Sequence, residues 1–310
     1  MIHIASRGSA LALAQANTVL GLCRAAFPGD AFELNIIKTT GDKLQTASLA
    51  NATLPKGLFT KEIEEALLNR TGDLAVHSLK DLPTELPPGL KLGAVSPRAD
   101  VRDALITRAT ESQGEISIRT LPHGATVATS STRRRAHLLD LRPDLNVVEI
   151  RGNVGTRLRK LAEQPALHAI ILAAAGLDRL HFRTGGAAEL SGPEVPPGLL
   201  ATPIPVEDML PCVGQAALGM EIRENDPALD RVCAALNDAP THACVAAERA
   251  FLRAMGGGCQ LAVGACAEIT AGTLRLRAVS FLGAKPRRGE RSGRPEDAAA
   301  IGRDLAQALL

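Results

Sequence analysis

The sequence predicts an α/β protein with mostly parallel sheets, followed by a smaller α+β domain at the C-terminus. Over the first two thirds, short apolar runs alternate with helical segments, the pattern of strands joined by covering helices. In the last third the pattern changes to a long helix, a run of glycines and two neighbouring strands. A chain of 310 residues can form two or three domains, each with its own core.

The first unit is predicted to start with a strand at residues 3–5. A helix at 9–24 is apolar nearly all round, and we therefore expect it to be buried. A strand at 32–37, an amphipathic helix at 60–70 and a short buried strand at 74–76 complete the unit.

A charged, proline-led segment at 97–103 predicts a crossover into a second unit. Strands are expected there at 126–128, 147–150 and 169–173, the first two followed by helices. The glycine- and proline-rich segment 192–205 is predicted to be the return connection.

The C-terminal part predicts a helix at about 241–255, strands at 261–267 and 274–281, and a final helix. Between the second strand and that helix, 285–294 is predicted to be a basic loop.

Composition argues against nucleic-acid binding. The net charge is +2, so any attraction of anions has to come from local clusters of basic residues. The chain has no Trp or Tyr and six Phe, whereas single-stranded nucleic acid is usually held by stacking on aromatic side chains. The sequence thus favours a small anionic ligand.

The chain is expected to be cytoplasmic and free of metal. Its N-terminus lacks a charged n-region and an apolar h-region, and no stretch approaches about 18 consecutive apolar residues. The six cysteines include no Cys-x-x-Cys pair, which favours free thiols over disulfides. His242 and Cys244 are too sparse a pair for a zinc site.

Three predicted strand-to-helix junctions, at 6–9, 129–135 and 151–157, carry arginine in or beside the first helical turn. Each also offers Ser or Thr as an N-cap. Arginine is unfavourable there, because a helix N-terminus already has positive character. Backbone N–H groups, hydroxyls and guanidinium groups together form an anion site.

These junctions lie at the carboxyl ends of strands, where α/β proteins bind ligands. From 133 to 160 there are eight basic residues and three acidic ones. We interpret the three junctions as one cradle for a ligand with several carboxylates or phosphates. The alternative is that the arginines form solvated helix faces or ordinary ion pairs.

Asp81 follows the short buried strand and Lys80. It is either a turn cap paired with the lysine or a carboxylate in a basic cleft that stabilises a cation and moves protons. Cys259 follows three glycines, at 256–258, which remove bulk around its thiol. This setting favours covalent attachment of a bulky group over a passive loop thiol.

Taken together, these segments resemble the porphobilinogen deaminase family, also called hydroxymethylbilane synthase. The resemblance runs nearly end to end and is specific because the motifs occur in order. The motifs lie at 7–12, 40–42, 56–62, 76–83, 102–104, 129–134, 151–158, 174–177, 213–215 and 257–260.

The resemblance implies a transferase that condenses four porphobilinogen molecules head to tail, with release of ammonia, into linear hydroxymethylbilane. It implies a covalent dipyrromethane cofactor joined by a thioether to Cys259. It also implies a monomer with two periplasmic-binding-protein-like α/β domains and a smaller C-terminal α+β domain. The domains would comprise 1–97 with 200–220, then 98–199, then 221–310.

The resemblance also implies roles for particular residues. Asp81 matches the family's catalytic aspartate, and the segment 45–56 is expected to be a lid over the cleft. The expected cofactor-binding residues besides Cys259 are Lys80, Thr129, Ser131, Arg133 and Arg134. The expected substrate-binding residues are Arg7, Ser9, Arg151, Gly152, Asn153, Arg157 and Arg179, with further positive charge from Lys56.

This chain departs from the family pattern at Thr132, Ala216 and Ala262, which stand for leucine, glycine and proline. None of the three has a chemical role in the expected site, so we expect an effect on loop shape only. Three rival interpretations remain: a solute-binding protein of the same fold, a nucleic-acid binder using 133–160, and a hydrolase with Cys259 as nucleophile. The first explains the arginines but neither Asp81 nor Cys259.

Overall fold

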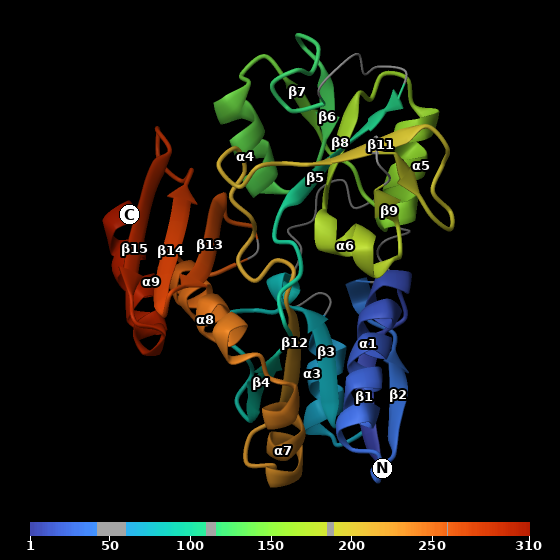
Figure 1. The fold of residues 1–310 in the computed structure, drawn as a ribbon, viewed down its shortest axis with the longest axis vertical. Coiled ribbons are helices and arrows are strands. Elements are labelled where there is room, and N and C mark those ends of the chain that lie inside the picture. The colour runs from blue at the N-terminus through green and yellow to red at the C-terminus, as the bar shows by residue number, and fades with distance from the viewer. Residues whose placement is uncertain (42–59, 110–115, 185–188, 259) are drawn as a thin grey trace.

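The structure, a computed structural model, describes residues 1–41, 60–109, 116–184, 189–258 and 260–310. The predicted lid at 45–56, with Lys56, and Cys259 itself lie outside the described residues. The predicted fold class is confirmed, because two α/β units are followed by a smaller α+β unit (Figure 1).

The first unit is built on a mixed five-stranded sheet in the order β2-β1-β3-β12-β4. Its β1 runs parallel to β2 and β3, whereas β12 is antiparallel to both of its neighbours. Apolar side chains of α1 and α7 cover one face, and those of α3 cover the other. The elements are β1 (Ile2–Arg7), α1 (Ala10–Ala26), β2 (Phe32–Ile37), α3 (Lys61–Leu68), β3 (Leu74–Ser78), β4 (Leu90–Val95), β12 (Leu218–Arg223) and α7 (Pro227–Leu236).

The second unit has a five-stranded sheet in the order β11-β5-β8-β6-β7, with β6 parallel to both β7 and β8. Side chains of α5 and α6 pack on one face and those of α4 on the other. The elements are β5 (Asp103–Arg108), β6 (Thr126–Ala128), α4 (Thr132–Leu141), β7 (Asn146–Val148), α5 (Val154–Glu163), β8 (Ala169–Ala173), α6 (Ala174–Arg179) and β11 (Leu199–Pro203), with a small hairpin of β9 (Arg183–Thr184) and β10 (Leu190–Ser191).

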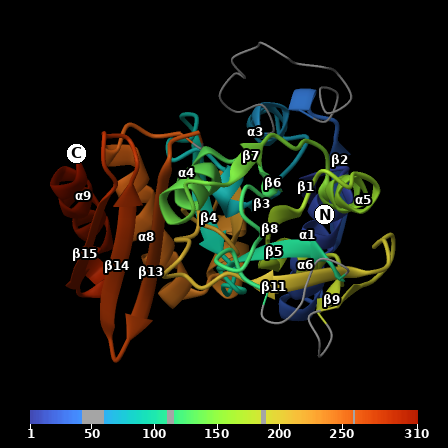
Figure 2. The same cartoon turned by 90° about the horizontal axis from the view of Figure 1, so that it is seen from above.

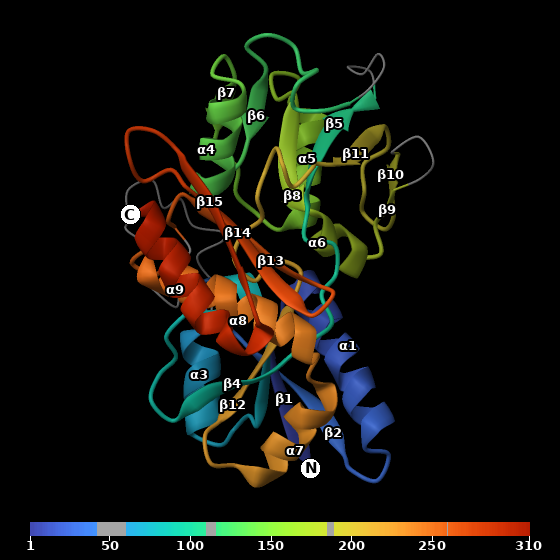
Figure 3. The same ribbon diagram turned by 60° about the vertical axis from the view of Figure 1, so that its left-hand side comes forward.

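The third unit is an antiparallel sheet in the order β13-β14-β15, packed against two helices (Figure 3). The helices lie very close together, because a Cβ at Gly302 would come within 2.2 Å of the Ala247 carbonyl oxygen. Seen from above, this unit lies beside the two α/β units (Figure 2). Its elements are α8 (Ala239–Ala254), β13 (Val263–Thr270), β14 (Thr273–Ser280), β15 (Arg287–Gly293), η3 (Pro295–Asp297) and α9 (Ala298–Leu309).

Several predicted details differ from the structure. The expected loop at 285–294 contains β15, and the expected return connection at 192–205 contains β11. Strand β15 lacks an apolar period because it is an exposed edge held by backbone pairing to β14. The sheets are mixed, because β12 and β5 each run antiparallel to both neighbours.

The predicted domain boundaries also shift. Residues 200–220 do not all return to the first unit, because β11 pairs with β5 in the second sheet. Helix α7 packs its apolar face on the first sheet, so the third unit starts at α8 rather than at 221.

The two α/β units meet at the carboxyl ends of their parallel strands. Helix α1, which follows β1, and helix α6, which follows β8, lie against each other where the two units meet (Figure 1). The connecting segments also meet there: the Ala99 N–H donates to the Ala216 carbonyl at 3.3 Å.

The third unit is bonded to the connecting segments of the α/β units through a buried carboxylate. Glu248 of α8 is fully buried and pairs with both terminal nitrogens of Arg98, at 2.6 and 3.0 Å. It also accepts the backbone N–H groups of Gly214 and Ala267, each at 2.8 Å. One side chain thus joins α8 to β13 and to both segments that connect the α/β units.

Candidate active site

Lys80 and Asp81 lie in η1 (Leu79–Asp81), the short 3-10 turn that directly follows β3. The end of the strand is held by Ser78, which exchanges hydrogen bonds of 2.8 and 3.1 Å with Gln15 of α1. The Leu79 N–H donates to the Ala217 carbonyl at 3.1 Å. Lys80 is half-buried, and Asp81 is exposed.

Arg133 and Arg134 lie in the first turn of α4 and share a buried carboxylate, Asp103 of β5. Arg133 Nη2 is 2.8 Å from Asp103 Oδ2, and Arg134 Nη2 is 2.7 Å from Oδ1. Gln215 Nε2 donates to the same Oδ1 at 3.0 Å. Burial alone would raise the pKa of Asp103, but the two arginines hold it well below its ordinary value. Asp103 is therefore a carboxylate that neutralises part of the arginine charge.

The alternative to a ligand cradle, that the arginines form ordinary ion pairs, therefore applies in large part to Arg133. Its side chain is 4% exposed, and its Nη1 donates to the Leu210 carbonyl at 2.7 Å. Arg134 Nη1 donates to the Ile171 carbonyl at 2.8 Å. Ligand binding by these two arginines stays a prediction, because the hydrogen bonds described for them are made to other residues of the protein.

Arg157 of α5 belongs to the same group of charges. Burial, together with the positive charge of Arg134, lowers the pKa of Arg157 to about 10, while Asp81 opposes the shift. Burial also lowers the pKa of Lys80, with Arg134 acting in the same direction and Asp81 against it. Residues of both α/β units therefore lie close enough to act on one another.

Positive charge exceeds negative charge in this group. Arg157 forms no ion pair with any residue that the structure describes, and its Nε donates to the Gly152 carbonyl at 2.8 Å. The interacting side chains comprise four cations and two carboxylates: Lys80, Arg133, Arg134 and Arg157 with Asp81 and Asp103. A partly desolvated cluster with this imbalance attracts anions.

The three predicted junctions are capped helix starts. Ser9 accepts from the Ala12 N–H at 3.3 Å and Ser131 from the Arg134 N–H at 3.4 Å. At the third junction the cap is Asn153, rather than the expected Ser or Thr, accepting from the Thr156 N–H at 2.9 Å. Gly152 precedes it with φ of 117°, and a Cβ there would lie 2.7 Å from Thr156 Cγ2. The turn into α5 therefore needs glycine.

The remaining predicted residues surround these junctions. Thr129 Oγ1 accepts from the Ser131 N–H at 3.2 Å, and Arg7 is half-buried at the end of β1. Arg179 Nη2 donates to the Ala216 carbonyl at 2.5 Å, which joins α6 to a connecting segment. Arg151 is exposed, lies 3.4 Å from Glu149, and lines a hollow of about 320 Å³.

Cys259 lies outside the described residues, but its neighbours are placed on both sides. Gly256, Gly257 and Gly258 all have positive φ, at 106°, 60° and 128°, which is the freedom predicted for this loop. A Cβ at Gly257 would lie 3.5 Å from Thr84 Oγ1 of the first unit. On the other side, the Gln260 carbonyl accepts from Thr132 Oγ1 of α4 at 2.7 Å. The loop therefore passes close to the first unit and is hydrogen-bonded to the second.

Two departures from the family pattern have visible consequences. Thr132 provides the hydroxyl that binds Gln260, a bond that leucine could not make. Ala216 has φ of 74°, a conformation in which glycine is unstrained and alanine is not.

Sequence reasoning missed part of the site. Asp103 appeared only within the motif 102–104, and its distance in sequence from Arg133 hid their pairing. Cys212, which no motif singles out in the sequence, lies among the charges of Arg133, Lys80 and Asp81. Burial raises the pKa of its thiol, so it stays protonated at neutral pH.

Two further findings concern the described residues only. They contain no group of three or more His, Cys, Asp or Glu side chains placed to hold a metal ion. None of the helices there is long and apolar enough to cross a membrane.

Two family models match the chain. "Porphobilinogen deaminase, dipyromethane cofactor binding domain" matches residues 2–231, and "Porphobilinogen deaminase, C-terminal domain" matches residues 242–310. The chain belongs to the porphobilinogen deaminase family.

Relatives named porphobilinogen deaminase agree with this assignment over the whole length. One from Syntrophobacter fumaroxidans is 44% identical and covers all of this chain and 94% of the relative. One from Rubrobacter xylanophilus is 47% identical and covers 99% of this chain and 93% of the relative. Among solved structures, substrate-binding domain 2 of Lactococcus lactis GlnP is similar with a TM-score of 0.44 and 13% identity, covering 82% of this chain and 90% of that one.

The charge of this cluster suits the dipyrromethane cofactor named in the family model. That group carries several carboxylates, and the cluster around Lys80, Arg134 and Arg157 has cations in excess of carboxylates. Arg133 contributes a further buried donor, since its Nε has no partner among the described residues. The residues on either side of the predicted attachment point are Gly258 and Gln260, and the Gln260 carbonyl is bonded to α4, which carries Arg133 and Arg134.

Proposed function

We propose that this protein condenses four porphobilinogen molecules head to tail, with release of ammonia, into linear hydroxymethylbilane. The observation that carries the proposal is the single charge group shared by both α/β units. In it Asp81 of the first unit acts on the Arg157 guanidinium of the second. This supports a site in which the proposed catalytic carboxylate acts beside the proposed anion-binding cations.

Each porphobilinogen ring has an acetate and a propionate, so the growing chain is densely anionic. Arg157 is the cation best suited to bind these groups, because it is partly desolvated and forms no ion pair within the described residues. Lys80, Arg134, Ser131 and Thr129 would hold the cofactor's carboxylates, with Arg133 beside them. Arg7, Ser9, Arg151, Gly152, Asn153 and Arg179 would contribute to substrate binding.

Asp81 would serve as the catalytic carboxylate. Loss of ammonia from porphobilinogen leaves a cation, and attack on it by the terminal ring of the growing chain puts positive charge on that terminal ring before its proton leaves. A carboxylate near the pyrrole N–H groups stabilises both charges and can accept that proton. Asp81 is exposed at the end of η1, so its oxygens are accessible to a substrate.

Cys259 would hold the cofactor through a thioether. When bound, dipyrromethane supplies the free ring position to which the first substrate unit is joined. The protein's contribution is to bind the carboxylates, orient the ring beside Asp81 and keep Cys212 protonated, so that this second thiol does not compete for the substrate-derived cation. We further propose that the protein is a cytoplasmic monomer that needs neither nucleic acid nor membrane.

The deciding experiment is the intact mass of the purified chain under denaturing conditions, beside a Cys259→Ser variant. We expect an excess equal to one dipyrromethane in the wild type and the bare mass in the variant. The holoenzyme should convert porphobilinogen to hydroxymethylbilane, which is detected by the absorbance of uroporphyrin after spontaneous ring closure with loss of water and subsequent oxidation. A bare mass even after incubation with porphobilinogen would favour a solute-binding protein instead.

A further inference from the structure

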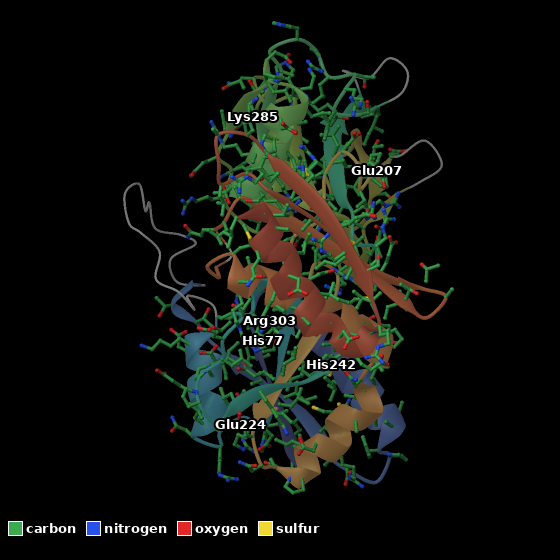
Figure 4. The ribbon with its side chains drawn as sticks, turned by 90° about the vertical axis from the view of Figure 1, so that its left-hand side faces the viewer. His77, Glu207, Glu224, His242, Lys285 and Arg303 are labelled. Atoms are coloured by element: carbon green, nitrogen blue, oxygen red, sulfur yellow. The ribbon has the colours of Figure 1, made fainter. Side chains whose placement is uncertain are left out.

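His77 is the penultimate residue of β3 and lies four positions before Asp81. Its imidazole lies on the sheet face covered by α3, because Ala75, two residues earlier, packs there while Leu74 and Val76 pack on the opposite face. The side chain is 5% exposed. Figure 4 places His77 in the part of the first unit nearer to the second.

The partner of His77 is Glu221 of β12, which is fully buried. His77 Nε2 lies 3.0 Å from Glu221 Oε2. One of these two atoms donates the hydrogen and the other accepts it, so the bond satisfies a buried polar atom on each side chain. Glu221 Oε1 has no partner among the described residues, so His77 provides the only bond that the structure shows to this carboxylate.

A second carboxyl group reaches the pair from α3. Burial raises the pKa of Glu64, the charge of Glu221 adds to the shift, and His77 opposes it. Two acidic groups and one imidazole are therefore enclosed between the sheet and α3. The imidazole is the hydrogen-bond partner that the described residues give Glu221, so its removal would leave a buried carboxyl group unpaired.

The end of β3 is thus held on both faces. Ser78 is bonded to Gln15 on the α1 face, and His77 is bonded to Glu221 on the α3 face. The next residue begins η1, which carries Asp81. Because η1 is short and directly follows β3, the position of Asp81 depends on how firmly the end of β3 is held.

We propose that the His77–Glu221 pair is a positioning element that sets where η1 presents the Asp81 carboxylate to the substrate. The proposal rests on the function proposed for Asp81. Misplacement of a catalytic group by about 1 Å can lower a rate by about 100-fold. Loss of the pair should accordingly reduce turnover without reducing substrate or cofactor binding.

The test compares His77→Leu, His77→Gln and Leu67→Ala as holoenzymes. Glutamine keeps an N–H donor at the position of Nε2, whereas leucine removes it. Leu67 is fully buried on the same sheet face, in the cluster with Ala75, and its substitution lowers stability without touching the pair. Intact mass reports cofactor loading, steady-state kinetics with porphobilinogen report kcat and KM, and thermal unfolding reports stability.

We expect His77→Leu to keep the cofactor and a KM within about twofold, with kcat lowered about tenfold or more. His77→Gln should recover most of that loss, and Leu67→Ala should lower the unfolding midpoint while keeping kcat. If His77→Leu does not fold, Glu221→Gln replaces it, with a smaller fall in kcat expected because the amide still accepts the hydrogen but without charge.

Three results would overturn the proposal: wild-type kcat in the variant that lacks or weakens the pair, no recovery by His77→Gln, or a loss of kcat in Leu67→Ala that matches its loss of stability. A wild-type chain without cofactor or turnover would instead refute the proposed function. The two failures are therefore distinguishable.

Discussion

Substitution of Asp103 by asparagine is expected to destabilise the fold strongly, because one buried carboxylate balances two buried arginines. Asp103 is fully buried and accepts hydrogen bonds of 2.7 to 3.2 Å from Arg133, Arg134 and Gln215. Removing one partner of a buried ion pair costs about 3–5 kcal/mol, since the other charge stays buried. Asparagine also turns an N–H donor toward these donors, so we expect a loss in this range.

Urea unfolding at pH 7 measures this loss, with Asp100→Asn as the matched control. Asp100 pairs with Arg102 at 2.6 Å, but both side chains are partly exposed, and surface pairs contribute about 0–1 kcal/mol. Both variants should be compared with the wild type in the Cys259→Ser background, so that cofactor loading does not differ. A loss below about 1 kcal/mol for Asp103→Asn, or equal losses in both variants, would refute the reasoning.

Comparison of the wild type with Asp103→Asn also gives a prediction about pH. The pKa of Asp103 is lower in the folded state than its ordinary value of 3.8. Its contribution is therefore complete above that value and is lost as the pH falls toward the folded-state pKa. The stability gap between wild type and Asp103→Asn should stay constant from pH 5 to 8 and narrow below about pH 4; a gap that widens on acidification would contradict the assignment.

Three further substitutions test the site and the strained turn. Asp81→Asn should keep the cofactor by intact mass but lower turnover of porphobilinogen about 100-fold or more, and near-normal turnover would exclude Asp81 from the mechanism. Arg157→Leu should raise KM about tenfold with little change in urea unfolding, because no ion pair is broken within the described residues; equal damage to binding and folding would count against the cradle. Ala216→Gly should raise the free energy of unfolding by about 1 kcal/mol by relieving the positive φ, and a destabilised variant would show that the strain is absent.

Local patterns in the sequence predicted much of the fold. The strands at 32–37, 126–128 and 169–173 have the predicted bounds, because each is a short apolar run bounded by turn residues. Long-range pairing was not predictable in the same way. Strand β12 enters the first sheet from far along the chain, and β15 has almost no apolar residues to mark it as a strand.

The candidate site likewise has features that local sequence patterns predicted and features that they did not. Arginines at helix starts were visible because they violate a local preference, and Gly256 to Gly258 marked the loop that needs positive φ. The partner that neutralises Arg133 and Arg134 was not visible, since Asp103 lies thirty residues earlier and its role depends on how β5 pairs with β8. Charge balance inside a site follows from topology, which local patterns do not encode.

The bonds of Glu248 bear on how the molecule could move. Arg98 and Gly214 lie on the two segments between the α/β units, so any rotation of one unit against the other would turn about these segments. Glu248 fastens α8 to both, and α8 leads directly into the glycine loop before Cys259. The third unit is thus bonded to both connecting segments, where a rotation of the α/β units would displace it least.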